Sequence, residues 1–216
     1  MSGAVIIGAG PLIGLSLAHR FARGGLCISV IARSRATVDA ALVSLDAAGA
    51  QATGIVADGA DETGLRAALD TIRAKDGVPD VLIYNAGVIR ADRPGELSAT
   101  GLLQTFAVNA VGAMTAGAHV GAQMADVGRG TILITGGMPE PMPAYTSLSL
   151  GKAGVRAVTA LLAAEYGPRG VHVATVTVAG AVAPGTPYDP DDIAESYWEL
   201  SNQVPGGWDE EFTYRV

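Results

Sequence analysis

Ala4-Val-Ile-Ile7-Gly8-Ala-Gly10-Pro-Leu12-Ile13-Gly14 is the stretch that decides the fold of this 216-residue chain. Its apolar, β-branched start predicts a strand, its glycines predict a tight turn, and the segment Ile13–Arg23 has helical character. A helix N-terminus offers unpaired N–H groups and a partial positive charge, which suit a phosphate. Strand, turn and helix in this order therefore predict a nucleotide site at Gly8, Gly10, Leu12, Ile13 and Gly14.

The rest of the chain repeats the alternation of strand and helix. Short β-branched runs predict strands at Ala4–Ile7, Cys27–Ile31, Gln51–Ala57, Asp80–Tyr84, Gly130–Thr135 and Val171–Val178. Alanine-rich segments predict helices at Ile13–Arg23, Ala36–Ala48, Asp61–Lys75, Ala99–Val127 and Ser147–Tyr166. Continuous apolar strands separated by helices indicate a mostly parallel sheet. We therefore expect an α/β fold, with one domain over residues 1–216 and a doubly wound, Rossmann-type sheet carrying helices on both faces.

The composition is that of a chain with a large core and few charges. Hydrophobic residues make up 49% and charged residues 16%, so an ordered protein is expected, with apolar surface left for a subunit interface. We expect a homodimer or homotetramer that acts on a small-molecule substrate. The net charge of −7 disfavours nucleic acid and anionic membranes as partners.

The sequence also favours a cytoplasmic protein. Its apolar runs are too short to cross a bilayer, and no basic segment precedes the first strand, so we expect neither a membrane segment nor a signal peptide. The single cysteine, Cys27, lies in an apolar run and is interpreted as a buried strand thiol.

Basic residues follow the second predicted strand in Ala32-Arg33-Ser34-Arg35. An acidic residue at this strand end would favour the ribose diol of NAD, whereas an arginine accommodates a 2′-phosphate. A guanidinium suits a phosphate because of its permanent charge and its fork of donors. We therefore expect NADP rather than NAD, with Arg33 as the main contact and Ser34 or Arg35 assisting. A solvated helix start is the alternative.

Five further motifs follow in order along the chain. They are Asp58 after the third strand, Asn85-Ala86-Gly87 after the fourth, Asn109 in Phe106-Ala-Val-Asn109-Ala-Val-Gly112, Lys152, and Ala179-Gly180 after the sixth strand. Together with the glycine turn, their order and spacing resemble those of the short-chain dehydrogenase/reductase family, over residues 3 to about 180. The resemblance implies a Rossmann-type fold and a nicotinamide cofactor.

The resemblance also implies a role for each matching residue. Asp58 would contact the adenine, and Asn85, Ala86 and Gly87 would lie beside the cofactor. Lys152 would hold the nicotinamide ribose, and Gly180 and Val182 would contact the cofactor. In this family a tyrosine exchanges a proton with the substrate oxygen, and the lysine lowers the pKa of that tyrosine. A serine polarises the oxygen, and an asparagine, here Asn109, holds a water of the relay.

The sequence departs from the family pattern at four positions. Ile7 replaces the threonine before the first glycine, and Leu12 replaces the middle glycine, which brings a side chain near the pyrophosphate. The position of the serine falls in Thr135-Gly136-Gly137, at Gly137, and Leu148 replaces the tyrosine. The first two changes would weaken or shift cofactor binding. The last two would remove the hydroxyls of the acid–base chemistry, so we expect a divergent member.

Four groups are candidates for the missing proton donor. Ser149 lies three residues before Lys152, so a helix places both on one face and the hydroxyl can approach the ammonium. Tyr145 lies seven residues before Lys152, about 10 Å along a continuous helix, too far unless the segment is a loop. Tyr188 in the C-terminal segment and Lys152 itself, if its pKa is depressed, complete the set. A packing role is the alternative for both tyrosines.

The remaining polar residues predict little chemistry. His19, His119 and His172 lie beside none of the motifs, so we interpret them as structural and expect no metal site. From Pro184 the chain gathers prolines, acids and aromatic residues, with a short helix predicted at Asp191–Leu200 and an edge strand at Glu211–Val216. We interpret residues 184–216 as a substrate loop or lid, with packing as the alternative.

Three functions are compatible with these features. The first is an NADP(H)-dependent oxidoreductase with an atypical active site, acting on a small carbonyl or alcohol, an enone or an imine. The second is a nucleotide-binding protein without redox chemistry, such as a sensor or partner-binding module. The third is an enzyme that uses the cofactor pocket for isomerisation, dehydration or cyclisation. The fold alone does not distinguish among them.

Overall fold

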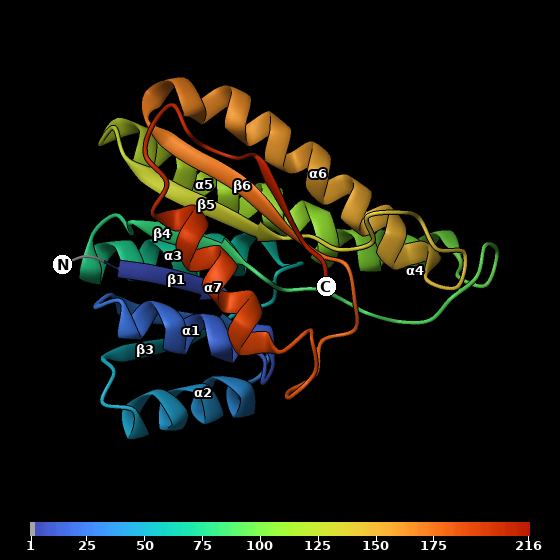
Figure 1. Ribbon diagram of the computed structural model, residues 1–216, viewed down its shortest axis with the longest axis horizontal. Helices are drawn as coiled ribbons and strands as arrows, with labels where there is room; N and C mark the ends of the chain where they lie inside the picture. The colour runs from blue at the N-terminus through green and yellow to red at the C-terminus, as the bar shows by residue number, and fades with distance from the viewer. Residues whose placement is uncertain (1–2) are drawn as a thin grey trace.

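A single parallel sheet forms the centre of the protein in a computed structural model, which describes residues 3–216 (Figure 1). Its seven strands lie in the order β3-β2-β1-β4-β5-β6-β7, and every neighbouring pair is parallel. The strands are β1 Gly3–Ile7, β2 Cys27–Ala32, β3 Ala52–Val56, β4 Val81–Tyr84, β5 Gly130–Thr135, β6 Val171–Val178 and β7 Glu211–Tyr214. The predicted doubly wound α/β domain is confirmed for this range; Met1 and Ser2 lie outside the described residues.

Helices cover both faces of the sheet. One face carries α1 Ile13–Arg23, α2 Arg35–Ala47 and α7 Pro190–Ser201, and the other carries α3 Glu62–Asp76, α5 Gly112–Asp126 and α6 Thr146–Tyr166. The helix predicted at Ala99–Val127 is interrupted: α4 Ala99–Phe106 passes through a π-helical turn at Ala107–Val111 before α5 begins. None of the helices within residues 3–216 is long and apolar enough to span a bilayer.

Strand β1 shows why the sheet is buried on both sides. Ala4 and Ile6 belong to the core under α1, α2 and α7, whereas Val5 and Ile7 belong to the core under α3, α5 and α6. Successive side chains of a strand point to opposite faces, so a run that is apolar at every position fits only a sheet covered on both sides.

The C-terminal segment completes this architecture. Helix α7 packs along α1 (Figure 1). Between these helices Phe21 meets Trp198 edge to face, and Arg20 lies 4.3 Å from the centre of the Trp198 ring. Strand β7 pairs with β6 at the sheet edge, from Thr175 beside Glu211 to Val178 beside Tyr214. The predicted short helix and edge strand are both present.

The chain order of the strands positions the site. From β1 the chain winds outward to β2 and β3, then returns to β4 on the other side of β1 and continues to β7. Ligands of open α/β sheets bind beyond the carboxyl ends of the strands where the winding reverses, here between β1 and β4.

The three histidines make structural contacts. His19 bonds Ser44 at 2.8 Å, His119 lies between Arg66 and Asp70, and His172 bonds the backbone oxygen of Asp209 at 2.9 Å. Within residues 3–216, no cluster of three or more His, Cys, Asp or Glu side chains has the geometry of a metal site.

Candidate active site

The glycine turn joins β1 to α1, and its glycines differ in how much space a side chain would have. Gly8 has a φ of +90°, and a Cβ there would meet the backbone of Ala86; a Cβ on Gly14 would meet the backbone oxygen of Gly8. These two glycines let the turn lie against the loop after β4 and the helix lie against the turn. Gly10 is different, because a Cβ there would meet no atom within 4 Å.

Helix α1 begins without a side-chain cap. Its N-cap residue is Leu12, 41% exposed, and the first turn contains no acid. Four other helices are capped by their own N-cap side chains: Ser34 on α2, Asp61 on α3, Ser98 on α4 and Asp189 on α7. The start of α1 therefore offers N–H donors and positive potential beside the open space at Gly10.

The carboxyl end of β2 presents an exposed guanidinium. Ser34 caps α2, accepting from the backbone N of Thr37 at 3.2 Å, and Arg35 lies 3.8 Å from Asp39. Arg33 is exposed and makes no ion pair or hydrogen bond with residues 3–216. Of these three residues, Arg33 is the one whose side chain makes no contact of this kind within residues 3–216.

Asn85 ties the turn to the sheet through a chain of hydrogen bonds. Its Nδ2 donates to the backbone oxygen of Gly8 at 2.8 Å, and its Oδ1 accepts from Thr135 Oγ1 at 2.8 Å. The Thr135 hydroxyl bonds the buried hydroxyl of Tyr197 at 2.7 Å. The sequence did not indicate Thr135 or Tyr197 as site residues, because this contact spans 62 positions.

The other predicted nucleotide residues lie around the same edge. The Asp58 carboxylate closes a turn by accepting from the backbone N of Ala60 at 3.0 Å. Ala86 lies against Gly8, and Gly87 lies against the carboxamide of Asn109. The structure thus brings the ends of β1, β3 and β4 together.

Asn109 fixes the loop after β4. It lies in the π-helical turn, where Oδ1 accepts from the backbone N of Val88 at 2.6 Å and Nδ2 donates to the Val88 oxygen at 3.2 Å. The side chain is buried, and a Cβ on Gly151 of α6 would collide with it. The extra residue of the π turn directs this carboxamide inward, and α6 packs closely on it.

Lys152 is a buried cation at the end of β5. Its Nζ donates to the backbone oxygen of Thr135 at 2.6 Å, and the residue is 7% exposed. Within residues 3–216 no carboxylate forms an ion pair with it. Burial lowers the pKa of Lys152 to about 8, so the amine exchanges a proton near neutral pH.

The positions before Lys152 carry no hydroxyl directed at it. Leu148 is buried one turn earlier on α6, and a Cβ on Gly137 would lie 3.7 Å from Lys152 Cε. Gly137 has a φ of +154° and Met138 a φ of +47°. Arg156 holds both residues by donating to their backbone oxygens at 3.3 and 3.4 Å. The backbone at Gly137 therefore disfavours a serine.

The structure corrects the expectation that Ser149 presents its hydroxyl to Lys152. Ser149 Oγ accepts from the backbone N of Met142 at 3.0 Å and donates to the Met142 oxygen at 3.4 Å, because the β5–α6 loop folds over the start of the helix. Tyr145 is the N-cap residue of α6, with φ −138°, so the spacing of a continuous helix does not apply to it. It is half-buried beside Asp92.

Asp92 was missed from the sequence and anchors the start of α6. This carboxylate is 3% exposed and accepts from Ser147 Oγ at 2.6 Å and from the Ser147 backbone N at 3.1 Å. It supplies the cap that Tyr145 lacks, and it ties the loop after β4 to the helix that carries Lys152.

Replacing Asp92 by alanine should lower the free energy of unfolding by about 2 kcal/mol, since buried hydrogen bonds to a charged group are lost. Asp61→Ala, which removes an exposed cap from α3, is the matched control and should cost about 1 kcal/mol. Urea unfolding measures both values. Equal losses would show that Asp92 is an ordinary helix cap.

The connection from β6 to α7 is short and internally braced. In residues 179–189 Tyr188 covers Gly180, Tyr214 Oη donates to the Pro187 oxygen at 3.2 Å, and Asp189 accepts from the backbone N of Gly185 at 2.6 Å. Val182 and Tyr188 pack against the core under α1. Tyr188 is thus a packing residue of this loop in the structure.

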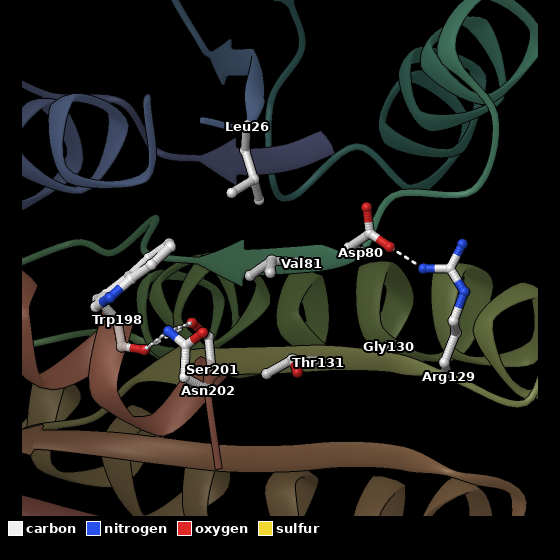
Figure 2. A pocket seen from close by; sticks show the side chains of 9 residues that line it. All are labelled: Leu26, Asp80, Val81, Arg129, Gly130, Thr131, Trp198, Ser201 and Asn202. Atoms are coloured by element: carbon white, nitrogen blue, oxygen red, sulfur yellow. Dashed lines mark hydrogen bonds and ion pairs between the residues drawn. The ribbon is translucent and has the colours of Figure 1, made fainter. Parts of the chain in front are cut away.

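A separate cavity opens at the opposite edge of the sheet (Figure 2). Its volume is about 270 Å³, and it is lined at the amino ends of β4 and β5 by Val81, Thr131 and the ion pair of Asp80 with Arg129. Trp198 of α7 and Asn202, directly after that helix, form the other wall. This cavity is not part of the candidate site, which lies at the carboxyl ends.

The fold and these motifs agree with a comparison against known families. The model of short chain dehydrogenases matches residues 2–189. The chain belongs to the short-chain dehydrogenase family. Membership makes it an oxidoreductase of the short-chain dehydrogenase type, in a family that binds nicotinamide cofactors.

Individual members of the short-chain dehydrogenase family support the assignment. D-threitol dehydrogenase of Mycolicibacterium smegmatis is 30% identical over 176 residues, covering 81% of this chain and 68% of that protein. The L-tagatose-forming galactitol 2-dehydrogenase of Cereibacter sphaeroides is 34% identical over 186 residues, covering 84% of this chain and 70% of that protein.

Solved short-chain dehydrogenases share the fold. A crystal structure from Rhodopseudomonas palustris superposes with a TM-score of 0.89 at 24% identity, covering 100% of this chain and 98% of the other. A metagenomic short-chain oxidoreductase in complex with NADP gives a TM-score of 0.89 at 24% identity, covering 98% and 95%. At these identities the likeness shows the fold alone.

Proposed function

We propose that this protein is an NADP(H)-dependent oxidoreductase with an atypical active site, acting on a small carbonyl or alcohol, an enone or an imine. One observation carries the proposal: the open space at Gly10 lies before the uncapped N-terminus of α1. The backbone N–H groups at the start of α1 are not capped by a side chain, and the helix end carries a positive potential. Both properties suit the pyrophosphate of a dinucleotide.

The preference for NADP rests on Arg33. This exposed guanidinium directly follows β2, where a dinucleotide places its adenine ribose, and no carboxylate within residues 3–216 forms an ion pair with it. A guanidinium binds a 2′-phosphate well because it is permanently charged and presents several N–H donors in one plane. The metagenomic relative in complex with NADP has the same fold, so the fold accommodates this cofactor.

We assign two roles to Lys152. It would bind the nicotinamide ribose, and it would hold or release a proton during the reaction. The bound nicotinamide would supply or accept the hydride. A pKa of about 8 lets the Lys152 amine hold or release a proton near neutral pH. Its neighbours Leu148 and Gly137 contribute no hydroxyl, so the proposed chemistry differs from that of a tyrosine-dependent member. Threitol and galactitol dehydrogenases are the supporting relatives for a small alcohol or carbonyl substrate.

Cofactor titration tests the proposal. The purified protein should bind NADPH at least about tenfold more tightly than NADH, measured by nicotinamide fluorescence, and Arg33→Ala should remove most of this preference, because a charged phosphate contact is worth about 1.5–3 kcal/mol. Arg35→Ala is the matched control, since Arg35 already pairs with Asp39, and it should keep the preference.

Three outcomes separate the alternatives. Turnover of a carbonyl, enone or imine panel with NADPH supports the oxidoreductase. Tight binding without turnover on that panel would favour a nucleotide-binding protein, in line with the absent hydroxyls. Absence of binding for both cofactors would overturn the proposal and leave the pocket for chemistry without cofactor turnover.

A further inference from the structure

We infer that Tyr197 is a positioning residue for the cofactor turn, acting from α7 through Thr135 and Asn85. The inference rests on the proposed function, because it concerns how the cofactor site is held. Tyr197 lies far from the glycine turn in sequence, and none of the motifs includes it.

The hydrogen bonds run in one direction. Thr135 Oγ1 donates to Asn85 Oδ1 at 2.8 Å, so its oxygen is left to accept from Tyr197 Oη at 2.7 Å. At the far end, Asn85 Nδ2 donates to the Gly8 oxygen at 2.8 Å. Gly8 also accepts from the backbone N of Gly10 at 2.8 Å. The phenol thus starts a chain that ends on the turn proposed to hold the pyrophosphate.

Thr135 is the junction of this chain with the cation of the site. Its side chain bonds Tyr197 and Asn85, while its backbone oxygen accepts from Lys152 Nζ at 2.6 Å. Thr135, at the end of β5, therefore helps to position both the glycine turn, through Asn85, and the ammonium group of Lys152. Tyr197 fixes the rotamer of Thr135 by occupying its acceptor site.

The environment keeps Tyr197 in the donor state. Its ring is fully buried between α1 and the sheet, and burial raises the pKa of its phenol well above the ordinary value. The hydroxyl stays protonated over the working pH range and donates steadily. Tyr197 therefore acts by fixing the position of Thr135, and it does not act as an acid in the reaction.

The other buried tyrosines also form hydrogen bonds, but their bonds differ from the bond between Tyr197 and Thr135. Tyr84 Oη donates to the backbone oxygen of Val108, and Tyr166 Oη donates to that of Ala118 at 3.2 Å. Each of these bonds ends on a helix backbone. The bond of Tyr197 is the one that continues through two side chains to the glycine turn.

The test is the dissociation constant of NADPH for Tyr197→Phe, which keeps the ring and removes the donor. We expect affinity to fall about fivefold, the effect of one neutral hydrogen bond, at every pH between about 6 and 8.5. Tyr166→Phe is the matched control: it removes a tyrosine hydroxyl from the other core and should shift the melting temperature without changing the dissociation constant.

A double-mutant cycle identifies the route. Thr135→Val alone should weaken NADPH binding at least as much, and Tyr197→Phe added to it should have no further effect. Additive losses would overturn the route through Thr135, and an unchanged dissociation constant in Tyr197→Phe would overturn the inference. If the unmodified protein binds no NADPH, the proposed function fails instead.

Discussion

Lys152→Met should raise the free energy of unfolding at pH 7 by about 2 kcal/mol while abolishing NADPH-dependent turnover. The ammonium is buried and pairs with no carboxylate in the described range 3–216, and its pKa is lowered from 10.5 to about 8, a cost of about 3 kcal/mol to the folded state. Loss of the bond to the Thr135 oxygen offsets about 1 kcal/mol of the gain. Methionine has a similar volume and no charge to desolvate.

The gain should depend on pH in a defined way. Below pH 8 both states of the unmodified protein carry the lysine proton, so the penalty is full and constant. Between pH 8 and 10.5 the unfolded chain binds a proton that the folded protein lacks, so stability rises with pH as the penalty fades. The difference between Lys152→Met and the unmodified protein should therefore shrink over this window.

Urea unfolding at pH 7 and pH 10 measures this effect. Lys75→Met, at an exposed position of α3, is the control and should change the free energy of unfolding by less than about 0.5 kcal/mol at both pH values. Destabilisation by Lys152→Met at pH 7 would contradict an unfavourable buried charge. It would indicate that the bond to Thr135 dominates.

Gly14→Ala should lower the stability of the fold, whereas Gly10→Ala should weaken NADPH binding without destabilising the protein. A Cβ on Gly14 meets the backbone oxygen of Gly8, which cannot move aside cheaply, so we expect a loss of about 3 kcal/mol of stability. A Cβ on Gly10 meets nothing, so its stability should stay within about 0.5 kcal/mol of the unmodified protein. The methyl group would instead fill the proposed pyrophosphate space and weaken NADPH binding more than about tenfold.

Thermal unfolding and nicotinamide fluorescence on the same samples measure both quantities. Gly25→Ala is unsuitable as a control because its φ is +87°, whereas Gly101→Ala lies inside α4 with ordinary contacts and should affect neither binding nor the fold. Unchanged NADPH affinity in Gly10→Ala would remove the observation on which the proposed function depends.

Periodicity and strand composition were sufficient to predict the sheet. Runs such as Ile28–Ile31 and Val171–Val178 are β-branched at nearly every position, and they became buried parallel strands. The interruption of the helix at Ala107–Val111 was not predictable, because neither proline nor a polar cluster marks it. The π turn coincides with a tertiary contact, the hydrogen bonds of the inward-facing Asn109 carboxamide with the Val88 backbone, which local sequence does not reveal.

The site was predictable where a motif is local and not where it depends on distant partners. Asn85 follows β4, and Lys152 on α6 reaches the carboxyl end of the neighbouring strand β5 through its Nζ; their motifs marked both from local sequence. Asp92 and Tyr197 were missed because their partners lie 55 and 62 positions away. The unusual backbone at Gly137, with a φ of +154°, was equally hidden from the sequence.

The contact of α7 with α1 has a consequence for synthesis of the chain. Helix α1, residues 13–23, precedes α7, residues 190–201, by more than 160 positions, and Trp198 of α7 packs edge to face on Phe21 of α1. During synthesis, α1 therefore lacks this cover until α7 has been made. A chain cut short before residue 190 would leave the α7-facing surface of α1 exposed, so we expect such a fragment to aggregate more readily than the full chain.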